Sequence, residues 1–409
     1  MSDSFSVTTS QSWFGRLFES IKSVLFGGIL FIVSFPLLFW NEGRAVRTAR
    51  SLTEGLGAVV SVPVDAVAPG NEGKLVHVSG AVKTDKPVVD DELAIQADAV
   101  KLFRNVEMYQ WKQSEHSETR KKLGGGSETV TTYDYKLEWA KGRIDSESFK
   151  KPEGHENPPA PAFDSKSFVA DPVRVGAFTM SKEQIDKLGG AVDFPVEAGA
   201  EEKVSKEAAA KLSSQKDRMP LMAKDGKFYS GMYVNGAPAP KLGDLRISFQ
   251  VIKPATVSLV GVQTAQSFAP FQAKAGDSIL LVEDGTHTAA EMFKTAQEQN
   301  KVLTWILRVV FFFMMFLGLF LFFRPIAVFA DVVPLVGTML GAGIGLFAFL
   351  GAAVLSFITI AIAWVYVRPV LGITLLVIAG AGLFWLIKVG RDKKAARAAA
   401  AGAPAATTN

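Results

Sequence analysis

The residue types that most often carry chemistry are scattered along this chain. Its four histidines, at positions 77, 116, 155 and 287, do not fall at metal-ligand spacings. His77 alternates with valines, which favours a residue on a sheet surface, and His155 lies beside Glu153 and Glu156 in a proline-rich stretch that would not converge on one ion. No nucleophile elbow, zinc-protease helix, phosphate-binding loop or dinucleotide fingerprint occurs. We therefore expect a protein that is not an enzyme and has no cofactor and no metal.

One carboxylate stands out because of its surroundings. Asp331 is the only acidic residue between Arg324 and Arg368, in a strongly apolar part of the chain. An ionisable group inside a bilayer is costly and often marks an ion or proton site. Nearby partner charges are lacking, however, and Pro334 follows three residues later. An interfacial loop is therefore the favoured interpretation, with an ion or proton site as the alternative.

Charge is segregated along the chain. Charged residues make up 21% of the sequence, but they are nearly absent from 23–41 and 302–387. This partition is typical of a protein shared between water and lipid. The formal net charge of +4 and the lack of a basic patch interleaved with aromatics argue against nucleic-acid binding. The absence of cysteine excludes disulfides, thiolate metal sites and lipid attachment through cysteine.

The apolar segments predict a polytopic helical membrane protein with four spans. A helix of about 20 apolar residues crosses the hydrocarbon core of a bilayer. No small-residue cleavage site follows the first segment, which favours a retained signal-anchor over a cleaved signal peptide. The predicted parts are an interfacial N-terminus at 1–22, transmembrane helices at 23–41, 302–323, 338–367 and 369–388, an interfacial or re-entrant loop at 324–337, and a basic, then alanine-rich disordered tail at 389–409.

Basic residues indicate the orientation. Five of them lie at or beyond the end of the last predicted span, namely Lys388, Arg391, Lys393, Lys394 and Arg397. A Lys/Arg excess marks the cytoplasmic side. Four spans then place both termini in the cytoplasm. The segment 42–301 is expected on the opposite side. Glycines 341 and 345 form a G-x-x-x-G pair, for which we expect a role in helix packing.

The segment 42–301 reads as a β-rich α+β domain of one or two subdomains. The glycines at 124–126 predict a hairpin loop. Ser181 with Gln184, and Thr288 with Glu291, form capping boxes that begin two helices. The second of these helices is expected to continue into the membrane, and 201–217 predicts a solvated helix. Strands are expected at 74–83, 100–111, 130–139, 244–253, 255–264 and 278–283.

Short motifs resemble the transmembrane protein 43 family, also called LUMA. Nine segments match in the same order and span nearly the whole chain: Asn41–Ala45, Ser51–Leu56, Asn71–His77, Ala99–Leu102, Val106–Trp111, Gly154–Pro158, Gly243–Phe249, Ser278–Gly285 and Tyr366–Pro369. From these we take the candidate structural or interaction residues, namely Asn41, Glu42, Gly43, Arg44, Glu72, Gly73, Tyr109, Trp111, Gly243, Asp244, Arg368 and Pro369.

The resemblance implies a non-enzymatic, structural or organising membrane protein with four spans. Its partners would be membrane lipids, further copies of itself as a homo-oligomer and unidentified membrane proteins. Animal members belong to the endoplasmic reticulum and inner nuclear membrane. The alanine-rich tail is typical of a bacterial member, which would lie in the inner membrane with a periplasmic or extracellular domain.

The expected function is a scaffold that self-associates and organises the membrane or membrane protein complexes. The alternative is a sensor or signalling adaptor whose outer domain binds a ligand. A channel or transporter is a third interpretation, for which the polar lining of the spans offers little.

Overall fold

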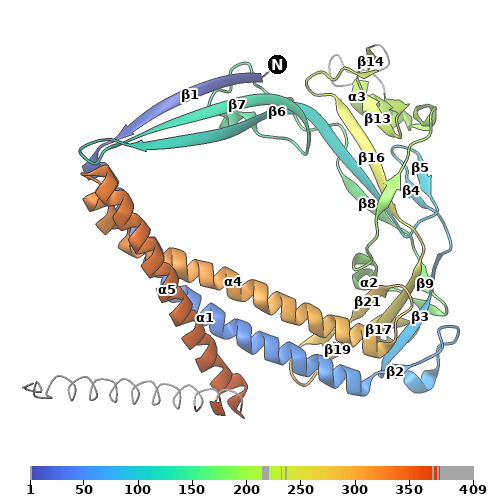
Figure 1. Cartoon of the computed structure of the whole chain (residues 1–409). Coiled ribbons are helices and arrows are strands. Elements are labelled where there is room, and N and C mark those ends of the chain that lie inside the picture. The colour runs from blue at the N-terminus through green and yellow to red at the C-terminus, as the bar shows by residue number, and fades with distance from the viewer. Residues whose placement is uncertain are drawn as a thin grey trace, which may run out of the picture. The chain divides into compact units, whose positions relative to one another are not determined.

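The structure is a computed structural model, and it describes residues 2–213, 221–231, 233–234, 237–370, 373–374 and 377. The chain divides into two compact units (Figure 1). The β unit comprises residues 1–11, 50–122 and 127–298, and the helical unit comprises 12–49, 123–126 and 299–409.

Two large sheets build the β unit. An eight-stranded sheet has the order β1–β7–β6–β16–β13–β12, with β8 paired to β6 and β11 to β16. Its strands are β1 (Ser2–Gln11), β6 (Lys101–Lys121), β7 (Ser127–Lys141), β8 (Lys166–Val169), β11 (Val192–Phe194), β12 (Met222–Lys224), β13 (Lys227–Ser230) and β16 (Leu245–Ile252).

The second sheet has seven strands in the order β10–β9–β3–β17–β18, with β2 on β3 and β21 on β17. Its members are β2 (Val60–Ser61), β3 (Leu75–Thr84), β9 (Val173–Val175), β10 (Phe178–Thr179), β17 (Thr256–Thr264), β18 (Ser267–Ala269) and β21 (Leu281–Asp284).

Smaller elements complete the unit. Three two-stranded ribbons pair β4 (Val88–Asp90) with β5 (Ile95–Ala97), β14 (Tyr233–Val234) with β15 (Ala237–Pro238), and β19 (Phe271–Gln272) with β20 (Ser278–Ile279). The short helices are α2 (Lys182–Asp186), α3 (Lys206–Ser213), η1 (Pro69–Asn71), η2 (Ser146–Ser148) and η3 (Ala200–Lys203).

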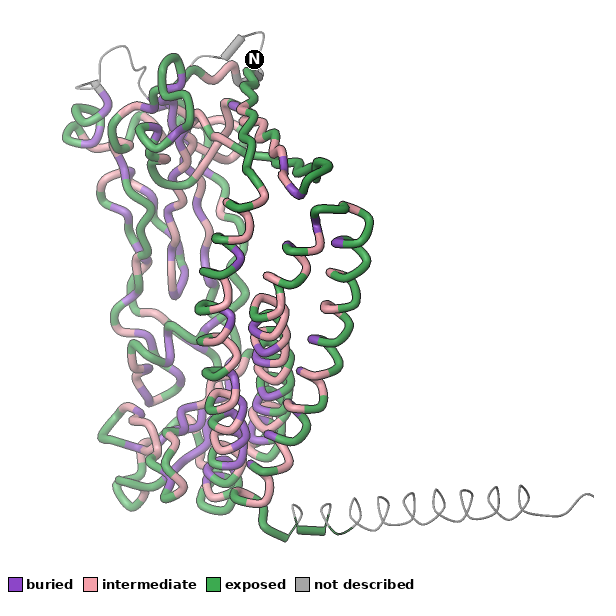
Figure 2. Tube along the Cα trace, turned by 90° about the vertical axis from the view of Figure 1, so that its left-hand side faces the viewer, coloured by how far each residue is buried: buried purple, intermediate pink, exposed green. Residues whose placement is uncertain are grey.

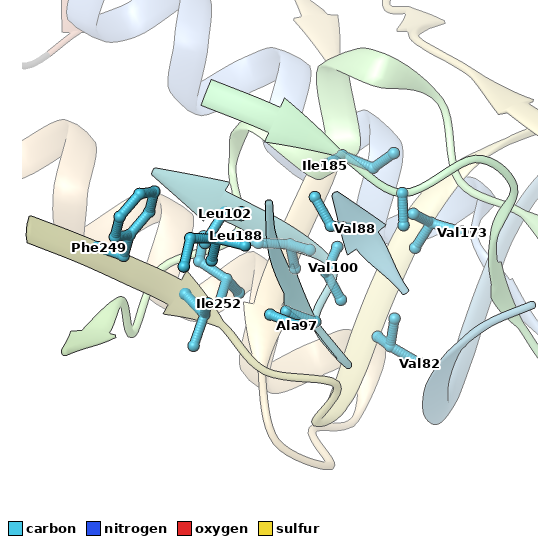
Figure 3. Close-up of a cluster of buried hydrophobic side chains, with 14 of the residues drawn as sticks. Val82, Val88, Ala97, Val100, Leu102, Val173, Ile185, Leu188, Phe249 and Ile252 are labelled. Carbon is cyan, nitrogen blue, oxygen red and sulfur yellow. The ribbon is translucent and has the colours of Figure 1, made fainter. Parts of the chain in front are cut away.

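The core of the β unit follows the period-two alternation of its strands. Along the first half of β6 every second residue is buried, from Leu102 through Val106 to Met108, because successive side chains in a strand point to opposite faces. These residues join a large apolar cluster with residues of β3, β9, β16 and α2 (Figure 3). A second cluster includes Leu52, Met292 and Phe293.

The strand ends correct some sequence-based bounds. β6 was expected to end at residue 111 but continues to Lys121, because its polar second half is paired residue by residue with β7. The hairpin at 124–126 and the two capping boxes are confirmed. The helix expected at 201–217 is described as α3, which buries Ala208 and Leu212, and residues 214–217 lie outside the described residues.

The N-terminus differs from its predicted form. Ser2–Gln11 forms β1, which pairs antiparallel with β7 from Ser2↔Lys136 to Gln11↔Ser127. No strand was expected at these residues, and the strand belongs to the same sheet as residues that follow the first apolar segment. The interfacial position of residues 1–22 stays a prediction. Phe5 and Val7 alternate with Ser4, Ser6 and Thr8, but two apolar residues are a weak period-two signal, and the strand was missed.

The helical unit is built on three long helices. α1 (Trp13–Ala58), α4 (Ala289–Ala330) and α5 (Pro334–Val367) are each long and apolar enough to cross a membrane. The structure thus has three candidate membrane helices among its described residues and a large β-rich unit, whereas four spans were expected. The predicted fourth span at 369–388 falls mostly outside the described residues, as does the tail at 389–409.

The loop between the second and third predicted spans is shorter than expected. Arg324 and Pro325 do not end α4, which includes Pro325 and runs to Ala330. Apolar helices tolerate a proline when neighbouring groups satisfy the freed carbonyl. Only residues 331–333 separate α4 from α5, and Pro334 occupies the first turn of α5. Exposed positions recur along the helices (Figure 2), as expected for surfaces that face lipid.

Glycines set the close approach of α1 to α4. A Cβ atom on Gly27 would lie 2.8 Å from the carbonyl oxygen of Gly318, and one on Gly318 would lie 2.6 Å from the backbone nitrogen of Phe31. The predicted packing pair is looser. A Cβ on Gly341 would lie 3.9 Å from Ala327 Cβ of α4, and one on Gly345 would lie 3.9 Å from the Phe320 ring of α4, which is ordinary contact.

Candidate functional site

Glu42 forms a buried ion pair within the helical unit. It lies on α1 just after the apolar segment, and its carboxylate accepts hydrogen bonds from Arg308 Nε at 2.6 Å and Nη2 at 2.7 Å. Trp364 of α5 donates its indole N–H to the same carboxylate at 2.7 Å. The Glu42 side chain is only 3% exposed. One carboxylate therefore connects α1, α4 and α5 through charge-assisted hydrogen bonds.

Beside the Glu42–Arg308 ion pair, the Arg44 guanidinium and the side chains of Asn41, Asn300 and Thr304 form a hydrogen-bond network between α1 and α4. Arg44 donates to Asn300 Oδ1 and to Thr304 Oγ1, each at 2.9 Å. Asn41 Nδ2 donates to the carbonyl of Thr304 at 3.1 Å, and Asn300 Nδ2 donates to the carbonyl of Ala45 at 2.9 Å. We call these residues together the Glu42 cluster: Asn41, Glu42, Arg44, Asn300, Thr304, Arg308 and Trp364.

The sequence identified only the α1 half of this cluster. The motif that follows the first span provided Asn41, Glu42 and Arg44. Their partners on α4 were missed, although Asn300, Thr304 and Arg308 recur every four residues and therefore share one helix face. That spacing of polar groups at the start of an apolar helix is the signal that would have found them. Gly43 lies between Glu42 and Arg44 in the chain. A Cβ atom added to it would have no neighbour within 4 Å, so the packing does not require glycine at this position.

A second paired charge lies at the other end of the bundle. Arg16, near the start of α1, forms an ion pair with Asp331 in the α4–α5 loop, and the Asp331 side chain is 2% exposed. The expectation that Asp331 lacks a partner charge is therefore wrong, because its partner precedes it by 315 residues. Asp331 does lie in a loop, since residues 331–333 separate the two helices, and the interfacial position of this loop stays a prediction.

The tip of the β6–β7 hairpin belongs to this end of the helical unit. Arg16 Nη1 donates to the carbonyl of Gly125, and Gly124 N–H donates to the carbonyl of Val332 at 3.2 Å. Trp13 Nε1 donates to the carbonyl of Val328 at 3.0 Å. We call Trp13, Arg16, Gly125 and Asp331 the Asp331 cluster.

The two clusters lie one bilayer thickness apart along the helices. Arg16 and Glu42 are 26 residues apart on α1, which corresponds to about 39 Å. Arg308 and Asp331 are 23 residues apart, which corresponds to about 35 Å. Since the hydrocarbon core is about 30 Å thick, each cluster falls near one boundary of the apolar segment.

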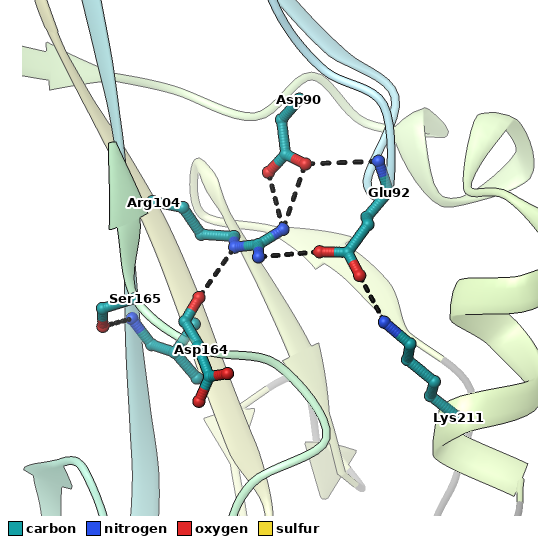
Figure 4. Close-up of polar contacts among 7 residues, drawn as sticks. Asp90, Glu92, Arg104, Asp164, Ser165 and Lys211 are labelled. Atoms are coloured by element: carbon teal, nitrogen blue, oxygen red, sulfur yellow. Dashed lines mark hydrogen bonds and ion pairs between the residues drawn. The ribbon is translucent and has the colours of Figure 1, made fainter. Parts of the chain in front are cut away.

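The β unit contains an ionic network whose centre, Arg104 and Asp90, is buried and whose outer members, Glu92 and Lys211, are partly exposed (Figure 4). Arg104 Nη1 binds both carboxylate oxygens of Asp90 at 3.0 and 2.9 Å, and its Nη2 donates to Glu92 at 2.8 Å. Lys211 of α3 pairs with the same Glu92, and Arg104 Nε donates to the carbonyl of Asp164 at 2.9 Å. These contacts connect β6 to the β4–β5 ribbon and to α3.

The two carboxylates of this network have opposite environments. Burial raises the pKa of Asp90, although the Arg104 guanidinium beside it acts in the opposite direction. Hydrogen bonds from Lys211 and from Arg104 lower the pKa of Glu92. Two positive and two negative groups neutralise one another, which is the arrangement of a structural network.

His77 is buried rather than on a sheet surface, which corrects the expectation. Its Nε2 lies 2.8 Å from the carbonyl oxygen of His287 and its Nδ1 lies 3.0 Å from the Ser61 hydroxyl. Because a carbonyl only accepts, Nε2 carries the proton and Nδ1 accepts from Ser61. Burial lowers the pKa of His77, which keeps the imidazole neutral. His77 thereby fixes the residue that precedes the Thr288 cap of α4.

The other motif residues in the β unit shape turns. Gly73 adopts φ +75° and its N–H donates to the carbonyl of Gln263 at 3.0 Å, while the Glu72 carboxylate accepts from the N–H of Ala265. Gly243 adopts φ +91° and its N–H donates to the carbonyl of Tyr109 at 2.7 Å. Tyr109 N–H in turn donates to the carbonyl of Asp244 at 2.8 Å.

The two remaining groups of motif residues lie elsewhere. The Trp111 ring packs edge-on against the His155 imidazole with centroids 4.7 Å apart. Arg368 ends α5, where its N–H donates to the carbonyl of Trp364 at 2.8 Å, and Pro369 follows. The structure therefore distributes the predicted site residues over several places. It brings Asn41, Glu42 and Arg44 together in the helical unit and Tyr109, Gly243 and Asp244 together in the β unit.

A mostly apolar cavity of about 230 Å³ lies in the β unit. Residues that line it include Val100, Leu188, Ile252 and Val257, with Lys253 and Asp284 as the charged members. Among the described residues, no three histidine, aspartate or glutamate side chains gather as metal ligands would.

These features define an integral membrane protein in which a bundle of apolar helices, joined by buried ion pairs, accompanies a β-rich unit. The Transmembrane protein 43 family model matches residues 108–369. The chain is similar to Transmembrane protein 43 of Homo sapiens, with 35% identity over 92% of each chain, and to that of Mus musculus, with 34% identity over 87% of this chain and 86% of the relative. It is 30% identical to the Transmembrane protein 43 homolog of Drosophila melanogaster, over 91% of this chain and 97% of the relative.

The chain therefore belongs to the transmembrane protein 43 family. No solved structure matches it.

Proposed function

We propose that this chain is a non-enzymatic membrane scaffold that self-associates and organises the membrane or membrane protein complexes. The observation that carries the proposal is that the polar side chains in the bundle bind one another and thereby hold the helices together. Glu42 pairs with Arg308 and Arg16 pairs with Asp331, while Arg44 donates to Asn300 and Thr304, so the charged groups of both clusters are bound by groups of the bundle itself. Polar side chains that bind one another between helices fix the positions of those helices. An ion pathway would instead need polar groups that face a channel.

The outer faces of the bundle offer surfaces to lipid or to other membrane proteins. Large apolar side chains are exposed along α5, and they include Met339, Phe347, Phe357 and Tyr366. Lipid and apolar helices of partner proteins are the natural neighbours of such a surface.

The proposal includes α1 as a retained anchor. The apolar part of α1 packs closely against α4, where a Cβ on Gly27 would lie 2.8 Å from the carbonyl oxygen of Gly318. A cleavage after residue 41 would remove this part of α1 from the bundle. The proposal keeps residues 369–388 as a fourth membrane span, which remains a prediction from the sequence. The cytoplasmic position of residues 1–22 stays a prediction, and β1 pairs with β7 of the β unit.

Light scattering of the full-length protein in nanodiscs tests the scaffold. The measured protein mass is expected to be a defined multiple of 44.0 kDa over a range of protein concentrations. A monomer at every concentration would contradict self-association.

The cavity in the β unit favours a sensor as the second candidate. Its lining suits a small apolar ligand, and ligand binding to the folded state raises the melting temperature. We expect hexanol to raise the melting temperature of the wild type more than that of Leu188→Trp, whose larger side chain would fill the cavity. Equal shifts in both proteins would argue against the sensor.

A further inference from the structure

β1 ends the eight-stranded sheet. Among the described strands it pairs with β7 alone, and its register runs without a bulge from Ser2↔Lys136 to Gln11↔Ser127. The backbone groups on its other edge are therefore available to a further strand. An open edge of this length is a template for pairing with another chain.

The devices that usually protect an edge are missing from β1. The strand has no proline and no lysine or arginine, and Asp3 is its one charged residue. The Asp3 carboxylate already faces Lys151 Nζ at 3.4 Å and His155 Nε2 at 3.6 Å. Phe5 is 41% exposed, so a large apolar side chain beside this edge is in contact with solvent.

The strand is complementary to itself in one antiparallel register. When a two-fold axis passes through Ser6, Phe5 of each copy lies opposite Val7 of the other, and Asp3 lies opposite Thr9. A register centred on Phe5 would place Asp3 opposite Val7. One centred on Val7 would place Phe5 opposite Thr9. Only the Ser6 register of these three pairs each apolar residue with an apolar residue of different size.

We propose that β1 pairs antiparallel with β1 of a second copy of this chain, about a two-fold axis at Ser6. The pairing would join two eight-stranded sheets into one sheet across the dimer. This inference rests on the proposed scaffold function and names the surface through which the scaffold self-associates.

Cysteine crosslinking tests this register directly, because the chain has no native cysteine. In full-length Ser6→Cys the two thiols face each other across the axis at the distance between neighbouring strands, which a disulfide can bridge. Mild oxidation in nanodiscs is expected to convert most of the protein into a covalent dimer. Ser10→Cys is the matched control, since its two copies would lie about 26 Å apart along the strands.

A mixture of two variants checks the register a second time. Ser4→Cys and Thr8→Cys face each other in the Ser6 register, so their mixture is expected to give a crosslinked heterodimer on oxidation. Equal crosslinking of Ser6→Cys and Ser10→Cys would overturn the proposal.

The outcome also separates this inference from the scaffold proposal. Absence of a Ser6→Cys crosslink in a sample that light scattering shows to be oligomeric would overturn β1 pairing and leave the scaffold in place. A monomer by light scattering would overturn both.

Discussion

The Glu42 carboxylate and the Arg308 guanidinium form a two-point ion pair between α1 and α4, although 266 residues separate them in the chain. Trp364 completes the carboxylate's hydrogen bonds from α5. A single acidic residue thus determines how three membrane helices meet. The consequence is that small changes at Glu42 should act on the whole helical unit.

Glu42→Gln should strongly destabilise the helical unit. The substitution keeps the shape of the side chain but leaves the Arg308 charge buried without its counter-charge, which costs about 3–5 kcal/mol. Thermal unfolding of the full-length protein in nanodiscs measures this loss. Glu19→Gln is the control, because Glu19 and its partner Lys22 are both largely exposed and such pairs contribute little.

Removing both members of the pair should restore part of the loss. In Glu42→Leu/Arg308→Met no charge is left without a partner, so the double variant is expected to be more stable than Glu42→Gln. Equal melting temperatures for Glu42→Gln and Glu19→Gln would contradict the structural role of the pair.

Gly125 at the hairpin tip should tolerate alanine less well than Gly124. Both glycines have positive φ, +82° and +85°, so alanine strains the backbone at either position by about 1–2 kcal/mol. Only at Gly125 would the added Cβ also collide with the Trp13 indole, at 2.8 Å from Cγ. Such overpacking costs about 1–3 kcal/mol more.

The measurement is again thermal unfolding, with Gly124→Ala as the matched control because nothing lies within 4 Å of its added Cβ. Trp13→Leu combined with Gly125→Ala should recover part of the extra loss, since the smaller side chain relieves the collision. A Gly125→Ala protein as stable as Gly124→Ala would show that the hairpin tip is not held against Trp13.

The sequence could predict elements that carry their own local signals. The Thr288 capping box placed the start of α4, and the glycines at 124–126 placed the β6–β7 hairpin. β1 was missed because only Phe5 and Val7 mark its apolar face and its partner strand β7 lies more than 100 residues later in the chain. Partners such as Arg16 and Asp331 were missed because they are distant in the chain, and a single sequence gives no direct sign of which distant charges meet.

The pairing of β1 with β7 also constrains the membrane topology. Open strands do not lie in the hydrocarbon core, since their backbone groups would lack partners there. Residues 2–11 and 127–136 must therefore be in water on one side of the membrane. The apolar length of α1 suits a complete crossing, which would place residues before and after it on opposite sides.

Residues 2–11 lie either on the same side of the membrane as β7 or on the opposite side. Single-cysteine labelling with a membrane-impermeant maleimide decides between these two arrangements. Ser6 on β1 and Ser117 on β6, both exposed, are suitable positions. The observed sheet predicts that Ser6→Cys and Ser117→Cys are labelled from the same side of sealed vesicles. Labelling from opposite sides would show that β1 does not join the sheet in the membrane.

An intrachain disulfide tests the same pairing without reference to the membrane. Ser6 lies opposite Thr132, with their hydroxyl oxygens 3.0 Å apart, so Ser6→Cys/Thr132→Cys should form a disulfide within one chain. Ser6→Cys/Thr129→Cys is the control, because residue 129 lies three positions away along β7, about 10 Å. The yield is measured for the disulfide within one chain, on the monomer band of a non-reducing gel, and equal yields of this species in both variants would argue against the register.

The buried imidazole of His77 should make the β unit sensitive to mild acid. Burial lowers the pKa of His77 in the folded protein below its ordinary value of 6.5. The unfolded chain therefore binds a proton at a pH where the folded chain does not, and the free energy of unfolding falls as the pH drops below about 6.5. The fall ends once the pH is below the folded-state pKa.

Unfolding measured between pH 7.5 and pH 5 should show this dependence in the wild type and a smaller one in His77→Gln, which has no group to protonate there. His116→Gln is the control, because His116 is exposed and its removal should leave the pH dependence unchanged. Since His77 holds the carbonyl of His287 immediately before the Thr288 cap, the loss should appear in amide exchange at the start of α4. A wild type and a His77→Gln variant with parallel pH profiles would show that the imidazole does not stay neutral in the folded protein.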